Sequence, residues 1–286
     1  MSILKKFPKL HTCHRILKES PLYNNFRIIK HLRKFYRYHN QTDYYHTKFG
    51  WTLFDKDNFL KNNLHRIEEI KNILADERSK MIYQGMINLR QTRNAKDYPF
   101  HFVKEYQYFL KKMKFTKDEV FIDCGASGIT IDTFIKHCPR YKQILAFEPV
   151  LKDYERLVVR HGGNPKITLL NKGVYDSECE LSFFENKIID NALHSDSIEI
   201  KTQTIDNLEL KKVTFIKMDV EGAELQALKG AENTIIRDKP KLAICIYHSC
   251  EDMVKIPEYI HNIVPEYKLF IRQYHFVGDT VLYAMI

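Results

Sequence analysis

The sequence predicts an α/β protein with a mainly parallel sheet, and two segments far apart in the chain carry most of that prediction. Val120–Gly128 and Ile216–Glu224 are each a short apolar run that ends in a carboxylate, followed by small residues and a helical pattern. The carboxyl ends of parallel strands open into the crevice where such folds bind their ligands. The two segments together indicate an enzyme that holds a small organic cofactor.

After Asp118, strand and helix patterns alternate, which is typical of βαβ units with right-handed crossovers. Residues 118–286 are therefore predicted to form the catalytic domain. Five strands are predicted, at 120–124, 144–148, 167–171, 213–219 and 241–247. Helices are predicted to start near residues 129, 151 and 223, and Pro240 blocks the continuation of the last one past Lys239. Alternating runs at 179–184 and 198–203 predict an antiparallel insertion, and runs at 267–272 and 281–284 predict a closing antiparallel pair.

Two segments precede this domain. Breaks at Pro8, Pro21 and Gly50 divide short helical patterns, which predicts a mobile, basic helical arm over residues 1–57. Residues 58–117 are predicted to be a helical segment that packs on the catalytic domain. It should hold two amphipathic helices between residues 58 and 90 and one more over residues 102–113.

The net charge of +9 is unevenly distributed. Residues 1–117 hold 25 Lys and Arg against 10 Asp and Glu, whereas residues 118–286 hold 20 against 26. Residues 5–37 are the densest part, with ten cations and one acid, Glu19. A solvated helical face explains this run, and the alternative is a surface for anionic lipid, a phosphorylated substrate or nucleic acid.

Composition also bears on class and location. The 286 residues are 44% hydrophobic, enough for a genuine core. No apolar run approaches the roughly 18 residues of a membrane span, and the first residues lack a secretory signal. The prediction is a cytoplasmic protein that binds peripherally at the inner face of the membrane through its arm. The six cysteines include no CxxC pair, so we expect neither a disulfide framework nor a zinc site.

The first candidate site is the loop after the first strand. Asp123 is followed by Gly125, Ala126, Ser127 and Gly128, and the glycines allow a tight turn and close approach to a ligand. The spacing fits neither a GxGxxG dinucleotide fingerprint nor a P-loop. A carboxylate at this position suits the ammonium and sulfonium charges of S-adenosylmethionine.

The next two strand ends carry further cofactor candidates. Glu148 ends the second strand, where an acid can accept hydrogen bonds from both ribose hydroxyls. Its alternative role is that of an acid near a helix N-terminus. Asn171 follows the third strand and is expected on the adenine side of the pocket.

Four segments together resemble the FkbM-type S-adenosylmethionine-dependent methyltransferases, over roughly residues 75–286. The segments are Phe121–Ala126, Ala146–Pro149, Ile216–Ala231 and Pro240–His248, and the Lys-Met-Asp-Val-Glu-Gly-Ala-Glu block at 217–224 is the most specific part. The resemblance implies the class I methyltransferase, Rossmann-like fold, with a mainly parallel seven-stranded sheet whose last strand is antiparallel. It also implies O-methylation of sugar hydroxyls. One departure is that Ser127 alone separates Gly-Ala from Gly128, so the first loop is one residue shorter than the family's pattern.

Methyl transfer to a hydroxyl requires alignment of the reactants and removal of the hydroxyl proton. His248, at the end of its strand, is the first candidate for the base because imidazole titrates near neutral pH. Its alternative role is to order the loop. The resemblance implies that Asp219 and Glu221 face the reaction centre, where they contact the cofactor, hold the acceptor or assist as base. Glu221 could instead be an acid at a helix N-terminus. These carboxylates lack a clear third partner, so no metal site is predicted.

The predicted function is an S-adenosylmethionine-dependent O-methyltransferase. Its acceptor would be a sugar hydroxyl of a glycan or of a nucleotide- or lipid-linked saccharide in surface polysaccharide biosynthesis. One alternative is an RNA methyltransferase whose basic arm follows phosphates. The chain lacks the Asp-Pro-Pro-Tyr and Asn-Pro-Pro-Tyr segments of base-amino methyltransferases, so nucleic acid is not the expected partner. The other alternative is a catalytically degenerate methyltransferase fold that serves as a binding module.

Overall fold

The computed structural model describes residues 54–55, 57–92, 106–184, 187–189, 197–274 and 278–286. Of the arm predicted over residues 1–57, only residues 54, 55 and 57 are among them. The division of the chain at residues 58 and 118 stays a prediction. None of the helices in the described parts of the chain combines the length and the apolar character that a membrane crossing needs.

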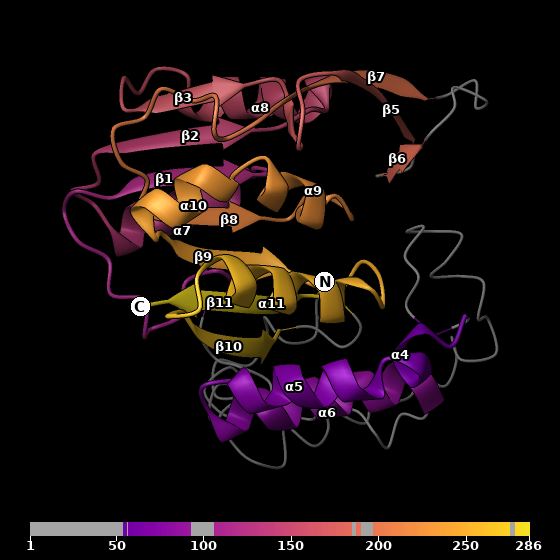
Figure 1. Cartoon of the computed structure of the whole chain (residues 1–286). Helices are drawn as coiled ribbons and strands as arrows, with labels where there is room; N and C mark the ends of the chain where they lie inside the picture. The colour runs from indigo at the N-terminus through magenta and orange to yellow at the C-terminus, as the bar shows by residue number, and fades with distance from the viewer. Residues whose placement is uncertain (1–53, 56, 93–105, 185–186, 190–196, 275–277) are drawn as a thin grey trace, which may run out of the picture.

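The central element is a seven-stranded sheet with the order β10-β11-β9-β8-β1-β2-β3 (Figure 1). Its strands are β1 (Val120–Cys124), β2 (Gln143–Phe147), β3 (Ile167–Leu170), β8 (Phe215–Met218), β9 (Lys241–Cys245), β10 (Lys268–Gln273) and β11 (Thr280–Met285). Neighbouring strands are parallel except at β11, which runs antiparallel to both β9 and β10. The predicted sheet with an antiparallel last strand is confirmed, and no end of the five predicted parallel strands moves by more than two residues.

Two hydrophobic clusters, one on each face, explain why these strands are apolar throughout. Successive side chains point to opposite faces, so Ile122 of β1 joins one cluster and Phe121 joins the other. The first cluster lies under α9 (Glu224–Lys229), α10 (Glu232–Asp238) and α11 (Asp252–Ile263). The second lies under α7 (Gly128–His137) and α8 (Leu151–His161). Because helices cover both faces of the sheet, the carboxyl ends of the parallel strands form the side of the domain that stays open.

A second, four-stranded sheet has the order β4-β7-β5-β6. It contains β4 (Gly173–Val174), β5 (Glu180–Phe184), β6 (Lys187–Ile189) and β7 (Ile198–Gln203). The predicted antiparallel insertion is confirmed, since β5 pairs antiparallel with β7. The short strands β4 and β6 were not predicted, because two or three residues carry no periodicity.

The helices before the sheet are α4 (Phe59–Asn62), α5 (Leu64–Ile73) and α6 (Glu77–Thr92). In Figure 1 they lie beside the β10 edge of the sheet, where α6 contacts β10 and α5 contacts α11. Asp76 ties this contact together. Its carboxylate accepts hydrogen bonds from Arg272 of β10, at 3.2 and 2.8 Å, and from Lys112 at 3.1 Å. These hydrogen bonds join the start of α6, the β10 edge of the sheet and the segment that leads into β1.

The helix predicted over residues 102–113 is wrong where the structure describes it. Residues 106–113 form turns, and Tyr108 has φ 71°, a left-handed conformation that an α-helix does not contain. The apolar residues that suggested a helix, Phe109, Leu110 and Met113, are buried against the sheet from an irregular segment. Burial rather than helical periodicity explains their apolar character.

The helix predicted to run from Ala223 to Lys239 is interrupted at Gly230 and becomes α9 and α10. A Cβ atom at Gly230 would lie 2.0 Å from the carbonyl oxygen of Tyr175, so the chain passes too close for any side chain there. Asp206 then accepts hydrogen bonds from the backbone N–H groups of Asn233 and Thr234 and starts the second helix.

Candidate functional site

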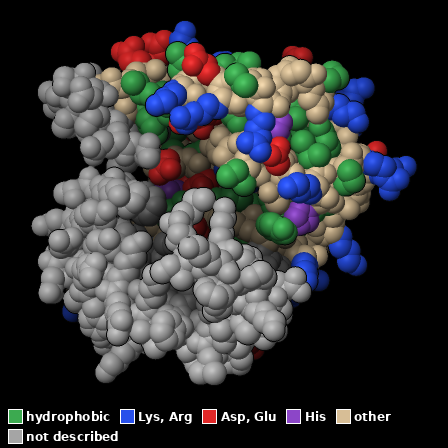
Figure 2. Space-filling view, turned by 180° about the vertical axis from the view of Figure 1, so that it is seen from behind, with side chains coloured by type: hydrophobic (Ala, Val, Ile, Leu, Met, Phe, Trp, Pro, Cys, Tyr) green, Lys and Arg blue, Asp and Glu red, His purple; other side chains and the backbone are tan. Residues whose placement is uncertain are grey.

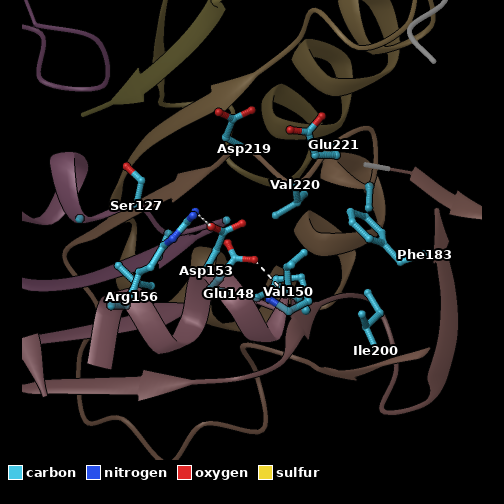
Figure 3. Close-up of a pocket in the computed structure, with 18 of the residues that line it drawn as sticks. Ser127, Glu148, Val150, Asp153, Arg156, Phe183, Ile200, Asp219, Val220 and Glu221 are labelled. Atoms are coloured by element: carbon cyan, nitrogen blue, oxygen red, sulfur yellow. Dashed lines mark hydrogen bonds and ion pairs between the residues drawn. The ribbon is translucent and has the colours of Figure 1, made fainter. Parts of the chain in front are cut away.

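A cavity of about 510 Å³ opens at the carboxyl ends of β1, β2 and β8, beside the small sheet (Figure 3). Its lining residues are Gly125–Ile129, Glu148–Val150, Asp153, Arg156, Leu157, Arg160, Gly173, Val174, Phe183, Ile200, Thr202, Asp219–Glu221 and Ala223. The space-filling view in Figure 2 shows a hollow with acidic side chains inside it and lysine and arginine side chains on the neighbouring surface. The position agrees with the ligand crevice expected for a parallel sheet.

The loop after β1 lines the cavity from Gly125 to Gly128, as the sequence predicted. Gly125 has φ 71°, and a Cβ atom on it would lie 1.9 Å from the carbonyl oxygen of Asp219. Only glycine therefore lets the loops after β1 and β8 meet. Ser127 accepts a hydrogen bond from the backbone N–H of Thr130 and caps α7. The loop lines the cavity although it is one residue shorter than the family's pattern.

Asp123 does not lie on the cavity wall, where the sequence argument expected it. Its carboxylate is fully buried behind the loop, 3.1 Å from the Nζ atom of Lys217. The reason is register, since Asp123 of β1 and Lys217 of β8 are partners across the two strands. Burial raises the pKa of Asp123 to about 6, although the ammonium of Lys217 opposes this shift.

Lys217 links the two loops. It donates hydrogen bonds to the carbonyl oxygens of Cys124, at 3.1 Å, and Gly125, at 2.5 Å. Burial acts to lower its pKa, but the carboxylates of Asp123 and Asp219 raise it above the usual value. Lys217 thus stays charged and holds the glycine loop against the end of β8.

Glu148 lies on the cavity wall, and Asn171 lies outside it. The Glu148 carboxylate accepts a hydrogen bond of 2.8 Å from the backbone N–H of Val150, and burial raises its pKa to about 7. The Asn171 amide donates to the carbonyl oxygens of Glu148 and Pro149, at 2.9 and 3.0 Å. Asn171 therefore braces the loop that carries Glu148, and the structure does not place it among the lining residues.

Asp219 and Glu221 both line the cavity after β8. The Asp219 carboxylate accepts hydrogen bonds from the hydroxyl groups of Tyr108, at 2.7 Å, and Tyr247, at 3.0 Å. Burial would raise its pKa, but Lys217 and His248 lower it below the usual value. Asp219 is therefore an ionised group in a fixed orientation.

Neither tyrosine is predicted as a site residue from the sequence. Tyr108 belongs to the segment over which a helix is predicted, and Tyr247 belongs to a predicted strand. The one signal for Tyr247 was its place beside His248, near the end of β9. No pattern in the sequence pointed to Tyr108.

His248 lies behind the two cavity carboxylates and is only 4% exposed. Its Nδ1 atom is 3.1 Å from Glu224, and its Nε2 atom is 3.5 Å from Glu221 and 3.6 Å from Asp219. Burial acts to lower its pKa, but the three carboxylates, Glu224 foremost, raise it to about 9. The ring is therefore an imidazolium at neutral pH, and it is not among the lining residues.

Glu224 organises the turn that carries Glu221. It is fully buried and accepts hydrogen bonds from the backbone N–H groups of Val220, at 2.8 Å, and Gly222, at 3.1 Å. Glu221 itself has φ 56°, a conformation that a non-glycine residue keeps only when its surroundings hold it there. The turn therefore fixes the direction in which Glu221 enters the cavity.

The sequence shows two cavity carboxylates without a third ligand for a metal ion, and the structure brings His248 close to them. Among the described residues, Asp219, Glu224 and His248 form a group whose potential ligand atoms lie within 4.8 Å of one another. The distances describe an ion-pair cluster in which the imidazolium, whose pKa the carboxylates raise to about 9, is the cation.

The sheet order and the cavity at the carboxyl ends of the parallel strands define a class I methyltransferase fold. A crystal structure of the methyltransferase FkbM from Methylobacillus flagellatus KT is similar, with a TM-score of 0.67 and 27% sequence identity. That likeness covers 79% of this chain and 59% of that chain. Residues 123–276, more than half of the chain, match the methyltransferase FkbM domain, and the chain belongs to this family.

A curated relative is the hexuronic acid methyltransferase AglP of Haloferax volcanii. It is 33% identical over 128 residues, which are 42% of this chain and 52% of the relative. The chain thus spans about half the length of this relative.

Stability should depend on the charge of His248. Its pKa is about 9 in the folded protein against 6.5 for a free histidine. The stabilisation is therefore full below about pH 6.5 and is lost as pH rises through about 9, on the order of 3 kcal/mol. Urea unfolding at pH 6.5, 7.5 and 9 should show this decline in the wild type and a flatter one in His248→Asn.

The matched control is His137→Asn, a substitution at an exposed histidine, which should keep the wild-type decline. Equal pH dependence in His248→Asn and the wild type would show that the buried imidazole carries no extra proton.

Proposed function

We propose that this protein is an S-adenosylmethionine-dependent O-methyltransferase that acts on a sugar hydroxyl in glycan biosynthesis. The observation that carries the proposal is the cavity at the carboxyl ends of the parallel strands, with Asp219 and Glu221 on its wall. Membership of the FkbM family supports the reaction type. The similarity to a hexuronic acid methyltransferase supports a saccharide acceptor, within the half of that relative that the match spans.

The cavity residues suit the three parts of the cofactor. Apolar side chains of Val150, Phe183 and Ile200 lie together on one side (Figure 3) and suit an adenine ring. Glu148 can accept hydrogen bonds from ribose hydroxyls. The loop Gly125–Gly128 and the ionised Asp219 suit the methionine portion, because its ammonium and sulfonium are cations. When bound, the cofactor supplies a methyl group already activated by its sulfonium.

In this proposal Glu221 accepts the proton of the acceptor hydroxyl. It lies on the cavity wall, and its turn holds it in one orientation. Asp219, with both oxygens bonded to tyrosines, keeps its charge and orients the reactants. His248, the base expected from the sequence, is buried behind these carboxylates and protonated at neutral pH. A base must be unprotonated, so we assign His248 as a positioning residue.

Glu221→Gln should lower kcat by about 10²-fold to 10⁴-fold, because a general base contributes roughly that much. The affinity for S-adenosylhomocysteine should stay within about twofold, since the amide keeps the shape of the carboxylate. Transfer of labelled methyl groups to nucleotide- and lipid-linked saccharides measures the first quantity, and calorimetric titration measures the second. Glu209→Gln, at an exposed glutamate outside the cavity lining, is the control.

The pH profile separates the two candidate bases. With Glu221 as proton acceptor, kcat/KM of the wild type should be level between about pH 8 and 9, above the Glu148 pKa of about 7, and fall above about 9, where His248 loses its proton. A rise of kcat/KM with pH up to about 9 would instead identify His248 as the base and refute this assignment.

We further propose that the basic arm, residues 1–57, holds the enzyme near anionic membrane or lipid-linked glycan, because residues 5–37 carry ten cations and one acid. The full chain should co-sediment with vesicles that contain anionic lipid, and less so as salt rises. A chain that lacks residues 1–50 should lose most of this binding. Equal co-sedimentation of the two chains would refute the proposal.

A further inference from the structure

Two arginines of α8, one helical turn apart, line the end of the cavity near the glycine loop. Residues at i and i+4 share a helix face, and both Arg156 and Arg160 are on the cavity wall. Figure 3 shows Arg156 beside Asp153 and Ser127, on the other side of Glu148 from Phe183 and Ile200. The cationic groups therefore lie at the end opposite to the apolar one.

Acidic partners hold each arginine in place without using all of its donors. Arg156 donates one hydrogen bond to Asp153, and Arg160 donates one to Asp132 of α7. A guanidinium has five N–H donors in a planar fork. Within the described part of the chain no other hydrogen bond of these two side chains is found, so each keeps donors for a ligand.

The close contact between α7 and α8 directs Arg160 toward the loop. A Cβ atom on Gly128 would lie 2.8 Å from the Cδ atom of Arg160, so the arginine side chain lies across the first residue of α7. The absence of a side chain at Gly128 makes room for this packing. Arg160 of α8 thus lies where the glycine loop joins α7.

The arginine side chains that line this cavity, Arg156 and Arg160, thus lie at its α8 end, where each is also paired with a carboxylate. Carboxylates of Asp219 and Glu221 lie after β8, and guanidinium groups of Arg156 and Arg160 lie on α8. A ligand that fits this pattern carries cations and an anion on one short chain. We propose that Arg156 and Arg160 bind the α-carboxylate of S-adenosylmethionine, while the acidic end faces its cations. This inference rests on the proposed function, because it names the residues that recognise one group of that cofactor.

The experiment compares two ligands that differ only in this carboxylate: S-adenosylhomocysteine and its decarboxylated analogue, which keeps the adenine, ribose, sulfur and amine. Calorimetric titration of the full-length protein should give about tenfold tighter binding of S-adenosylhomocysteine, as expected for charge-assisted hydrogen bonds at a partly exposed site. The double variant Arg156→Ala/Arg160→Ala should lose this preference and should bind the decarboxylated analogue as the wild type does.

Two control variants define the specificity of the effect. Arg140→Ala removes an exposed arginine outside the cavity lining and should keep the wild-type preference. Arg156→Lys/Arg160→Lys keeps the charges but not the planar forks, and should keep only part of the preference. Thermal unfolding without ligand checks that each variant is folded.

The inference is overturned if the double alanine variant keeps the wild-type preference. If that variant also raises KM only for acceptors that carry a carboxylate or phosphate, the arginines belong to the acceptor. Equal loss of affinity for both ligands would likewise overturn the inference, because it would reflect a damaged cavity. If the wild type binds neither ligand, the proposed function itself fails, whereas equal binding of both ligands by the wild type removes only the inference about the arginines.

Discussion

The site depends on one buried cation, Lys217, which connects the ends of two neighbouring strands. It pairs with Asp123 across the sheet and donates hydrogen bonds to two carbonyl groups of the glycine loop. Burial of two charges is costly, so such a pair adds little net stability compared with apolar residues. The pair instead fixes the position of the glycine loop. Loss of either partner alone would leave a charge without compensation in the interior and would free the loop that lines the cavity.

A second buried cation, His248, holds the turn that carries Glu221 in place, as Lys217 holds the glycine loop. The imidazolium lies among the carboxylates of Asp219, Glu221 and Glu224, and this lets three acids stay close together. Tyr108 and Tyr247 complete the arrangement by donating to both oxygens of Asp219. Because Tyr108 precedes the sheet, the segment before the catalytic fold also contributes to the site.

The strands and the glycine loop could be predicted from the sequence because each depends on local pattern. Gly125 needs a positive φ, and Glu148, Asp219 and Glu221 follow strands whose carboxyl ends share one edge. The places of Asp123 and His248 depend instead on distant partners. Asp123 turns away from the cavity because Lys217 is its neighbour across the sheet, and His248 is buried because Glu224 holds it. The role of Tyr108 could not be predicted because its segment combines apolar residues with an irregular backbone. The helix break at Gly230 could not be predicted because it depends on the carbonyl group of Tyr175, which is distant in the sequence.

We propose that the loops after β1 and β8, held together by Lys217, form one binding site for the cofactor. Hydrogen exchange measured by mass spectrometry, with and without S-adenosylhomocysteine, tests this claim most directly. Exchange should slow in both loops, residues 124–128 and 219–222, over the same range of ligand concentration, while the exposed turn at residues 162–163 is unaffected. Slower exchange in only one loop, or in neither, would contradict the account.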